Sequence, residues 1–176
     1  MSENALISII GPDRVGLVAS VTGCLFDLGC NLIDTTFAVL GGGAEFTAIC
    51  EVPADLELES IEACLDRLGE TADAEISVSP FEFSPTHGPS GEITHRIKVV
   101  GGDRPGLIAR LSEVFVQYEA NIVRLNARKQ EDERGDQYEV AISVWLPPRR
   151  AQTCLATVAN TAGELGLKYE VREVTS

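Results

Sequence analysis

The fold of this 176-residue chain is decided by a stretch that occurs twice: Asp13-Arg14-Val15-Gly16-Leu17-Val18-Ala19 and, ninety residues later, Asp103-Arg104-Pro105-Gly106-Leu107-Ile108-Ala109. Asn31 returns at the same offset as Asn121. A repeat of this period in a chain of this length favours two small related domains. Because the repeat keeps a glycine-bearing turn, a helix start and a polar residue after the helix, it also suggests two related ligand pockets.

The residues that follow each turn have the spacing of an amphipathic helix. Apolar positions recur three and four residues apart until Gly29, and the second copy keeps the same six positions. These positions are Leu17, Val18, Val21, Cys24, Leu25 and Leu28, matched by Leu107, Ile108, Leu111, Val114, Phe115 and Tyr118. The pattern predicts one helix with a buried face in each half.

The other segments predict strands and a second helix in each half. Short β-rich or alternating runs bounded by turn residues predict strands, and apolar residues spaced three and four apart predict helices. In the first half these are strands at 6–10, 31–40 and 46–52, a helix at 58–68 and a strand at 75–83. In the second half the hairpin is longer, and we expect its charged stretch 130–137 to form an exposed loop. The alternating strand there spans 140–146, followed by a helix at 155–165 and a strand at 167–174.

Both halves therefore have the order β-α-β-β-α-β. This order predicts an α+β fold of two ferredoxin-like domains, each with a four-stranded antiparallel sheet and two helices on one face. We assign residues 1–83 and 94–176 to the domains and residues 84–93, which are rich in turn formers, to a linker. Each half is small and leaves one sheet face open, so we expect a homodimer or a tight two-domain unit.

The net charge of −13 lies entirely in the first half. Residues 1–90 carry two basic and fifteen acidic side chains, so 2 − 15 = −13, and residues 91–176 carry twelve of each. Nucleic acid and anionic membranes both need a basic surface. We therefore expect no direct nucleic-acid partner and no membrane partner. The acids either keep the chain dissolved or face a basic protein.

Cysteine and histidine usage argues against disulfide and metal scaffolds. The five cysteines are odd in number, form no Cys-x-x-Cys pair and lie on or beside apolar stripes. We interpret them as reduced core residues, and two histidines do not complete a zinc site. The N-terminus has no signal-peptide pattern and no long apolar span follows, so the sequence favours a cytoplasmic protein without metal or cofactor.

The repeated turn has the chemistry to bind an amino acid. A helix N-terminus offers unpaired backbone N–H groups to a carboxylate, and glycines allow a ligand to approach. The ammonium group could donate hydrogen bonds to the amide oxygens of Asn31 and Asn121 or to the carboxylates of Asp13 and Asp103. A purely structural interpretation also stands, because Asp can cap a helix, Asn commonly follows one, and tight turns need glycine.

These residues resemble tandem ACT domains, and most closely the glycine cleavage system transcriptional repressor family. The resemblance covers almost the whole chain and is most specific over Leu28-Gly29-Cys30-Asn31-Leu32-Ile33-Asp34, Phe37-Ala38-Val39-Leu40 and Glu45-Phe46-Thr47. It implies a regulatory module that binds a small amino acid, such as glycine or serine, often at an interface between domains or subunits. Carried over by position, one pocket comprises Gly11, Pro12, Asp13, Arg14, Val15, Gly16 and Asn31. The other comprises Gly101, Gly102, Asp103, Arg104, Pro105, Gly106 and Asn121.

The two turns differ at two positions that affect the backbone. Pro12 stands where the second copy has Gly102, and Val15 stands where it has Pro105. Proline removes a donor and glycine widens the accessible angles, so the pockets should not bind equally. We favour the first as the functional pocket, although the second has the more usual Asp-Arg-Pro-Gly form.

Other functions fit poorly. His87 and His95 have no evident Ser, Cys or Asp partner, and no phosphate-binding loop is present, so we expect no enzyme. An RNA-recognition module would need basic residues and several aromatic rings on the open sheet face, whereas the third strand offers only Phe46 beside two glutamates. Two hypotheses remain: an amino-acid sensor that acts through a transcription factor, and a detached regulatory subunit of a metabolic enzyme.

Overall fold

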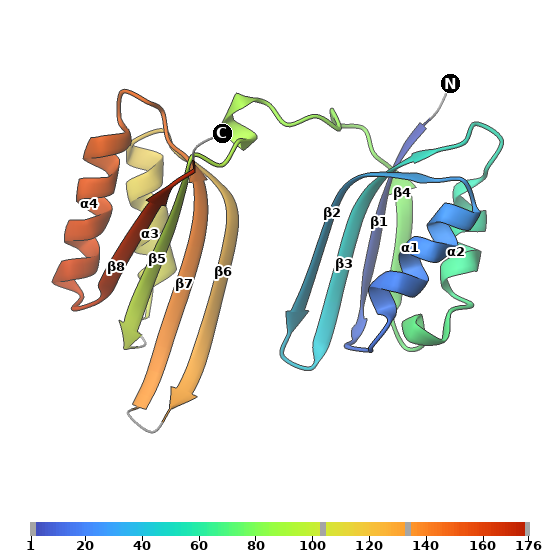
Figure 1. Ribbon diagram of the computed structural model, residues 1–176, viewed down its shortest axis with the longest axis horizontal. Helices are drawn as coiled ribbons and strands as arrows, with labels where there is room; N and C mark the ends of the chain where they lie inside the picture. The colour runs from blue at the N-terminus through green and yellow to red at the C-terminus, as the bar shows by residue number, and fades with distance from the viewer. Residues whose placement is uncertain (1–2, 103–104, 133–134, 175–176) are drawn as a thin grey trace. The chain divides into compact units, whose positions relative to one another are not determined.

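The computed structural model describes residues 3–102, 105–132 and 135–174. The chain divides into two compact units, Met1–Thr86 and His87–Ser176, so the division falls inside the segment 84–93. Each unit contains one four-stranded antiparallel sheet with two helices on one face (Figure 1). The ferredoxin-like α+β fold expected from the sequence is therefore confirmed.

The first unit is built around a sheet with the strand order β2-β3-β1-β4. Strand β1 occupies the centre with β3, and β2 lies at one edge. The elements are β1 (Glu3–Pro12), α1 (Leu17–Asp27), β2 (Asn31–Leu40), β3 (Gly43–Val52), α2 (Leu58–Leu65), the short 3-10 helix η1 (Gly69–Thr71) and β4 (Glu75–Pro80). Helix α2 is shorter than the sequence predicted: it ends at Leu65, and Leu68 lies outside it.

Alternation along the strands puts every second residue into the core of the first unit. Ala5, Ile7 and Ile9 of β1 are fully buried and face the helices together with Phe46 of β3. The intervening residues of β1 and β3 line the other, open face of the sheet. Phe46 is among the largest buried side chains, and its truncation to alanine would cost about 3–5 kcal/mol.

The second unit repeats this arrangement in the order β6-β7-β5-β8. Its elements are the 3-10 helix η2 (Pro89–Gly91), β5 (His95–Gly102), α3 (Leu107–Gln117), β6 (Asn121–Asp132), β7 (Gly135–Trp145), α4 (Ala151–Glu164) and β8 (Lys168–Glu173). The expectation of a loop at 130–137 was wrong for residues 130–132 and 135–137, which belong to strands, while residues 133 and 134 lie outside the described part of the chain. The ladder continues through the pairs Gln130–Gln137 and Asp132–Gly135, because an antiparallel hairpin can extend while its backbone hydrogen bonds stay paired.

The cysteines are not all reduced, which corrects the sequence interpretation. Cys24 of α1 and Cys64 of α2 are joined by a disulfide that links the two helices of the first unit. Sequence spacing could not reveal this pair, because the residues are 40 positions apart. Cys30, Cys50 and Cys154 are free and buried, and burial raises the pKa of the Cys50 thiol to about 12 and that of Cys154 to about 11.

Two negative findings apply to the described part of the chain. None of its helices has both the length and the apolar character needed to cross a membrane. Within the same ranges, no group of three or more His, Cys, Asp and Glu side chains is placed to hold a metal ion.

Candidate functional site

The first candidate site is the turn between β1 and α1. Gly16 immediately precedes the helix with a left-handed backbone (φ 94°), and Gly106 does the same in the second unit (φ 78°). Neither helix has a side-chain cap. The alternative that Asp13 caps the helix is therefore wrong, because the cap position is three residues further on and needs glycine for its positive φ.

The glycine before this turn is required for packing. A Cβ atom on Gly11 would lie 2.5 Å from the Cβ of Ala74 and 2.8 Å from its Cα. A Cβ atom on the equivalent Gly101 would overlap a methyl group of Leu167. Both glycines thus let the first strand pass closely under the segment that leads into the last strand. Their role in this structure is close packing, which is independent of any ligand.

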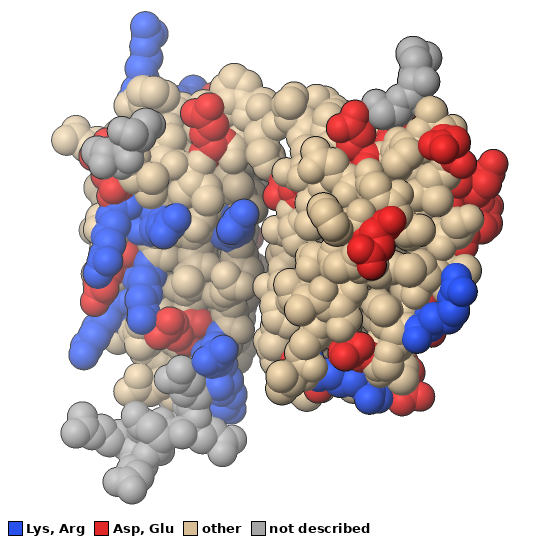
Figure 2. Space-filling model, turned by 45° about the vertical axis from the view of Figure 1, so that its right-hand side comes forward, with Lys and Arg blue, Asp and Glu red and all other residues tan. Residues whose placement is uncertain are grey.

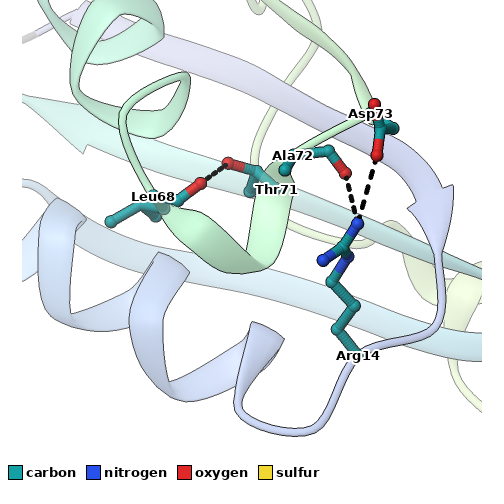
Figure 3. A network of polar contacts seen from close by, with 5 residues as sticks. All are labelled: Arg14, Leu68, Thr71, Ala72 and Asp73. Atoms are coloured by element: carbon teal, nitrogen blue, oxygen red, sulfur yellow. Dashed lines mark hydrogen bonds and ion pairs between the residues drawn. The ribbon is translucent and has the colours of Figure 1, made fainter.

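Arg14 forms hydrogen bonds that link the β1–α1 turn to the segment between η1 and β4 (Figure 3). Its Nη2 donates to the carbonyl oxygen of Ala72 and to Oδ2 of Asp73, both at 3.2 Å. Thr71 supports the same segment, because its hydroxyl donates to the carbonyl oxygens of Leu65 and Leu68 at 2.6 and 3.0 Å. The Arg14 Nε is buried without a hydrogen-bond partner in the described residues. Arg14 therefore positions the turn, and its Nε–H group has no acceptor among the described residues.

A shallow open depression lies beside this turn. Its volume is about 510 Å³, and it is lined by residues 13–19 and by Phe37 of β2. Most backbone N–H groups at the start of the helix have no hydrogen-bond partner within the described residues, namely those of Val15, Gly16, Val18 and Ala19. The N–H group of Leu17 donates to the backbone carbonyl oxygen of Arg14. The exposed Asp13 carboxylate borders the same space. Unpaired N–H groups and one carboxylate are thus collected within a single helical turn.

Asn31 does not join this depression within its own unit. Its register partner in β3 is Glu51, whereas Pro12, at the turn, is paired with Gly43. Eight residues of β3 separate these two levels, a distance of about 26 Å. The side chain of Asn31 is exposed and makes no hydrogen bond in the described structure. The structure therefore brings together residues 13–16 but leaves Asn31 at the opposite end of the sheet.

The second candidate site is described only in part. Asp103 and Arg104 lie outside the described residues. Pro105 and Gly106 are exposed, and a Cβ on Gly102 would meet open space. Asn121 again starts the edge strand, but its Nδ2 donates to the carbonyl oxygen of Ser90 at 2.8 Å. Its amide is thus partly used in holding the segment that precedes β5.

Phe37 is the residue at this site that the sequence analysis missed. It is 41% exposed and lies on the helix-facing side of β2, opposite Phe46. The sequence did contain a signal. Edge strand β2 carries exposed apolar residues on both faces instead of a clean alternation: Leu32, Ile33, Phe37, Val39 and Leu40. Such a strand is unusual at the edge of a sheet in contact with water.

Comparison with known proteins places this geometry in a family context. Residues 3–79 match the family model of the ACT domain. The glycine cleavage system transcriptional repressor of Escherichia coli K12 is 28% identical over 172 residues, which cover 92% of this chain and 88% of that protein. A UPF0237 protein of Methanosarcina mazei is 26% identical over 97 residues, covering 54% of this chain and 98% of that protein.

Two solved structures share the fold of the whole chain. A protein of unknown function from Galdieria sulphuraria superimposes with a TM-score of 0.77 at 20% identity and covers 99% of this chain and all of that one. A putative glycine cleavage system transcriptional repressor superimposes with a TM-score of 0.70 at 18% identity and covers 100% of this chain and 99% of that one. Residues 3–79 are thus similar to an ACT domain, and the chain resembles the repressor along most of its length.

Proposed function

We propose that this chain is a non-enzymatic regulator that binds a small amino acid at the β1–α1 turn of its first unit. The observation that carries the proposal is the depression at the start of α1, where unpaired N–H groups lie within one turn of a free carboxylate. The N–H groups and the positive end of the helix dipole suit an amino-acid carboxylate. Asp13 suits the ammonium group, and Phe37 supplies an apolar wall that limits the side chain.

We infer that Asn31 reaches this site from a second copy of the chain. Strand β2 is an edge strand, so its outer backbone groups are free to pair with another strand. Antiparallel pairing of two β2 strands about a two-fold axis sets the start of one strand against the end of the other. Asn31 of one copy would then lie level with Leu40 of the other, which is paired with Gly43 beside the turn.

The surface around β2 supports this pairing. Phe37 and Val39 of the strand are 41% and 45% exposed, and Phe26 of α1 is 78% exposed. Apolar side chains along a free edge favour association, whereas charged ones oppose it. The equivalent edge strand β6 carries exposed Arg124 and Arg128. Pairing through the first unit is therefore the arrangement that both buries apolar surface and completes the site.

The relatives suggest the process that is regulated. The repressor of Escherichia coli resembles this chain over both units, so we propose that this chain too acts in transcriptional control of glycine cleavage. The acidic first unit would be repelled by DNA phosphates, so the effect is passed through a protein partner. Ligand binding changes the affinity of the chain for this partner only if the ligand-free and ligand-bound states bind the partner differently.

Isothermal titration tests the binding step. Purified chain is titrated with glycine, serine, one branched and one aromatic amino acid, with sedimentation velocity run in parallel. We expect saturable heat with a small amino acid and a shift toward dimer, since the ligand holds groups from two copies. Absence of heat across the whole panel would refute the sensor role, and binding by a strictly monomeric chain would refute the shared site.

A further inference from the structure

The open sheet face of the second unit is basic, which the total charge of that unit conceals. Register places six basic side chains on the face opposite the helices, and all six are exposed. They are Arg96, Lys98, Arg124, Arg128, Lys168 and Arg172. Among the residues whose side chains the structure describes, which leaves out 130–136, two acids share the face, Glu139 and Glu170, so the charges there sum to 6 − 2 = +4. In Figure 2, Lys and Arg gather on this unit, while Asp and Glu dominate the first.

Most of these charges have no ion-pair partner among the described residues of the unit. Lys98 pairs with Glu139 at 2.8 Å, but no ion pair involves the other five within the part of the chain that the structure describes. Arg96 lies directly opposite Arg172 in the β5–β8 ladder. Like charges in directly opposed positions destabilise a sheet. A surface that keeps such a pair together is one that an anionic partner would stabilise.

We propose that this face, which we call the basic face, docks an acidic surface of a protein partner. The proposal rests on the regulatory function proposed above, because it supplies the surface through which the regulator acts. Four of the six basic residues are arginines, whose planar fork bonds a carboxylate through two parallel hydrogen bonds. Arg124, Arg96 and Arg172 lie in one row across the strands, level with Ser143. The row presents three such forks to a line of carboxylates.

A protein fits this face better than a nucleic acid. The two glutamates on the face repel phosphates but can pair with basic residues of a mixed-charge protein surface. The chain also carries the acidic first unit, with 2 − 15 = −13 charges, which opposes the close approach of a polyphosphate. Single-stranded nucleic acid further needs successive aromatic rings, and the described part of this face offers one, the half-buried Trp145.

Fluorescence anisotropy on the full-length chain tests the proposal. The probe is a labelled dodecapeptide of alternating glutamate and serine, compared with its glutamine–serine analogue and with single-stranded DNA of equal length at low salt. We expect the acidic peptide to bind and the analogue not to bind. The double substitution Arg96→Glu/Arg172→Glu should weaken peptide binding at least tenfold, and Arg96→Lys should retain most of it.

The matched control changes two basic residues away from the face. Arg110→Glu/Arg149→Glu makes the same change in net charge and should alter binding less than twofold. Equal losses in both double variants, or no peptide binding, would overturn the proposal, and tighter binding of the DNA would reassign the face to nucleic acid. Amino-acid titration of the same variants separates the two proposals, since the basic face lies outside the β1–α1 turn and its loss should leave that binding intact.

Discussion

The two units keep one backbone plan but differ in the surfaces they expose. Both begin their first helix after a left-handed glycine, and both start the edge strand with asparagine. The first unit has an apolar edge and an open sheet face with four acids and no basic residue: Asp34, Glu45, Glu51 and Glu75. The second unit has a charged edge and the basic face. Duplication thus conserved the core while the surfaces diverged.

This difference is the one that our two proposals require, because they assign ligand binding and partner docking to different units. Core positions tolerate little change, because each apolar side chain is packed against several others. Surface positions are free to change sign, so one copy can specialise in ligand binding and self-association while the other docks a partner.

The largest expected difference concerns the disulfide. The first unit links α1 and α2 through Cys24 and Cys64, whereas the second unit has Val114 and Thr161 at the matching positions. Cys64→Thr should lower the free energy of unfolding of the first unit by about 2–4 kcal/mol. Trp145 is the only tryptophan, so its fluorescence follows the second unit and circular dichroism follows both. A shift of the Trp145 transition, with none elsewhere, would contradict this assignment.

The second difference concerns the glycines before the two turns. Gly11→Ala should cost about 1–3 kcal/mol, because the new methyl group would meet backbone and Cβ atoms of Ala74 that cannot move aside. Gly101→Ala should cost less, since the nearest obstacle is a methyl group at the end of the flexible Leu167 side chain. Denaturant unfolding of both variants tests the order. Equal costs would show that both contacts relax alike.

The edge strands give the third comparison. Phe37→Lys should weaken self-association about tenfold, or about 1.4 kcal/mol, because it puts a charge on the edge that we propose for pairing. Leu125 is an exposed apolar residue on the other edge strand, and Leu125→Lys should change the dissociation constant of self-association less than twofold. Sedimentation equilibrium measures both. If the Leu125 variant has the larger effect, pairing runs through the second unit.

The smallest effect is expected at the ion pair that holds the turn. Asp73→Asn removes the charge facing Arg14 but keeps a residue that tolerates the positive φ of 66°. The Asp73 side chain is 82% exposed, so the loss should be about 0.2–1 kcal/mol and should shrink with added salt. Thermal unfolding at low and high salt checks this. A larger, salt-independent loss would mean that the backbone of the turn itself has changed.

The fold was accessible from the sequence because it depends on periodicity. The helix after each turn and the hairpin from Asn31 to Val52 follow from apolar spacing, and the structure confirms them. The site was less accessible. The resemblance placed Asn31 in one pocket with the turn, but helix α1 carries the chain to the far end of the sheet before β2 begins at Asn31. The Cys24–Cys64 pair and the basic face depend on register and helix packing, which only three-dimensional structure supplies.

The most direct test of the account is amino-acid titration of two matched variants. Asn31→Ala and Asn121→Ala remove the same group from equivalent positions, but Asn121 is already bonded to Ser90. We expect Asn31→Ala to weaken binding of the small amino acid at least tenfold and Asn121→Ala to change it less than twofold. Binding that is unaffected by Asn31→Ala, or lost only with Asn121→Ala, would contradict the assignment of the ligand site to the first unit.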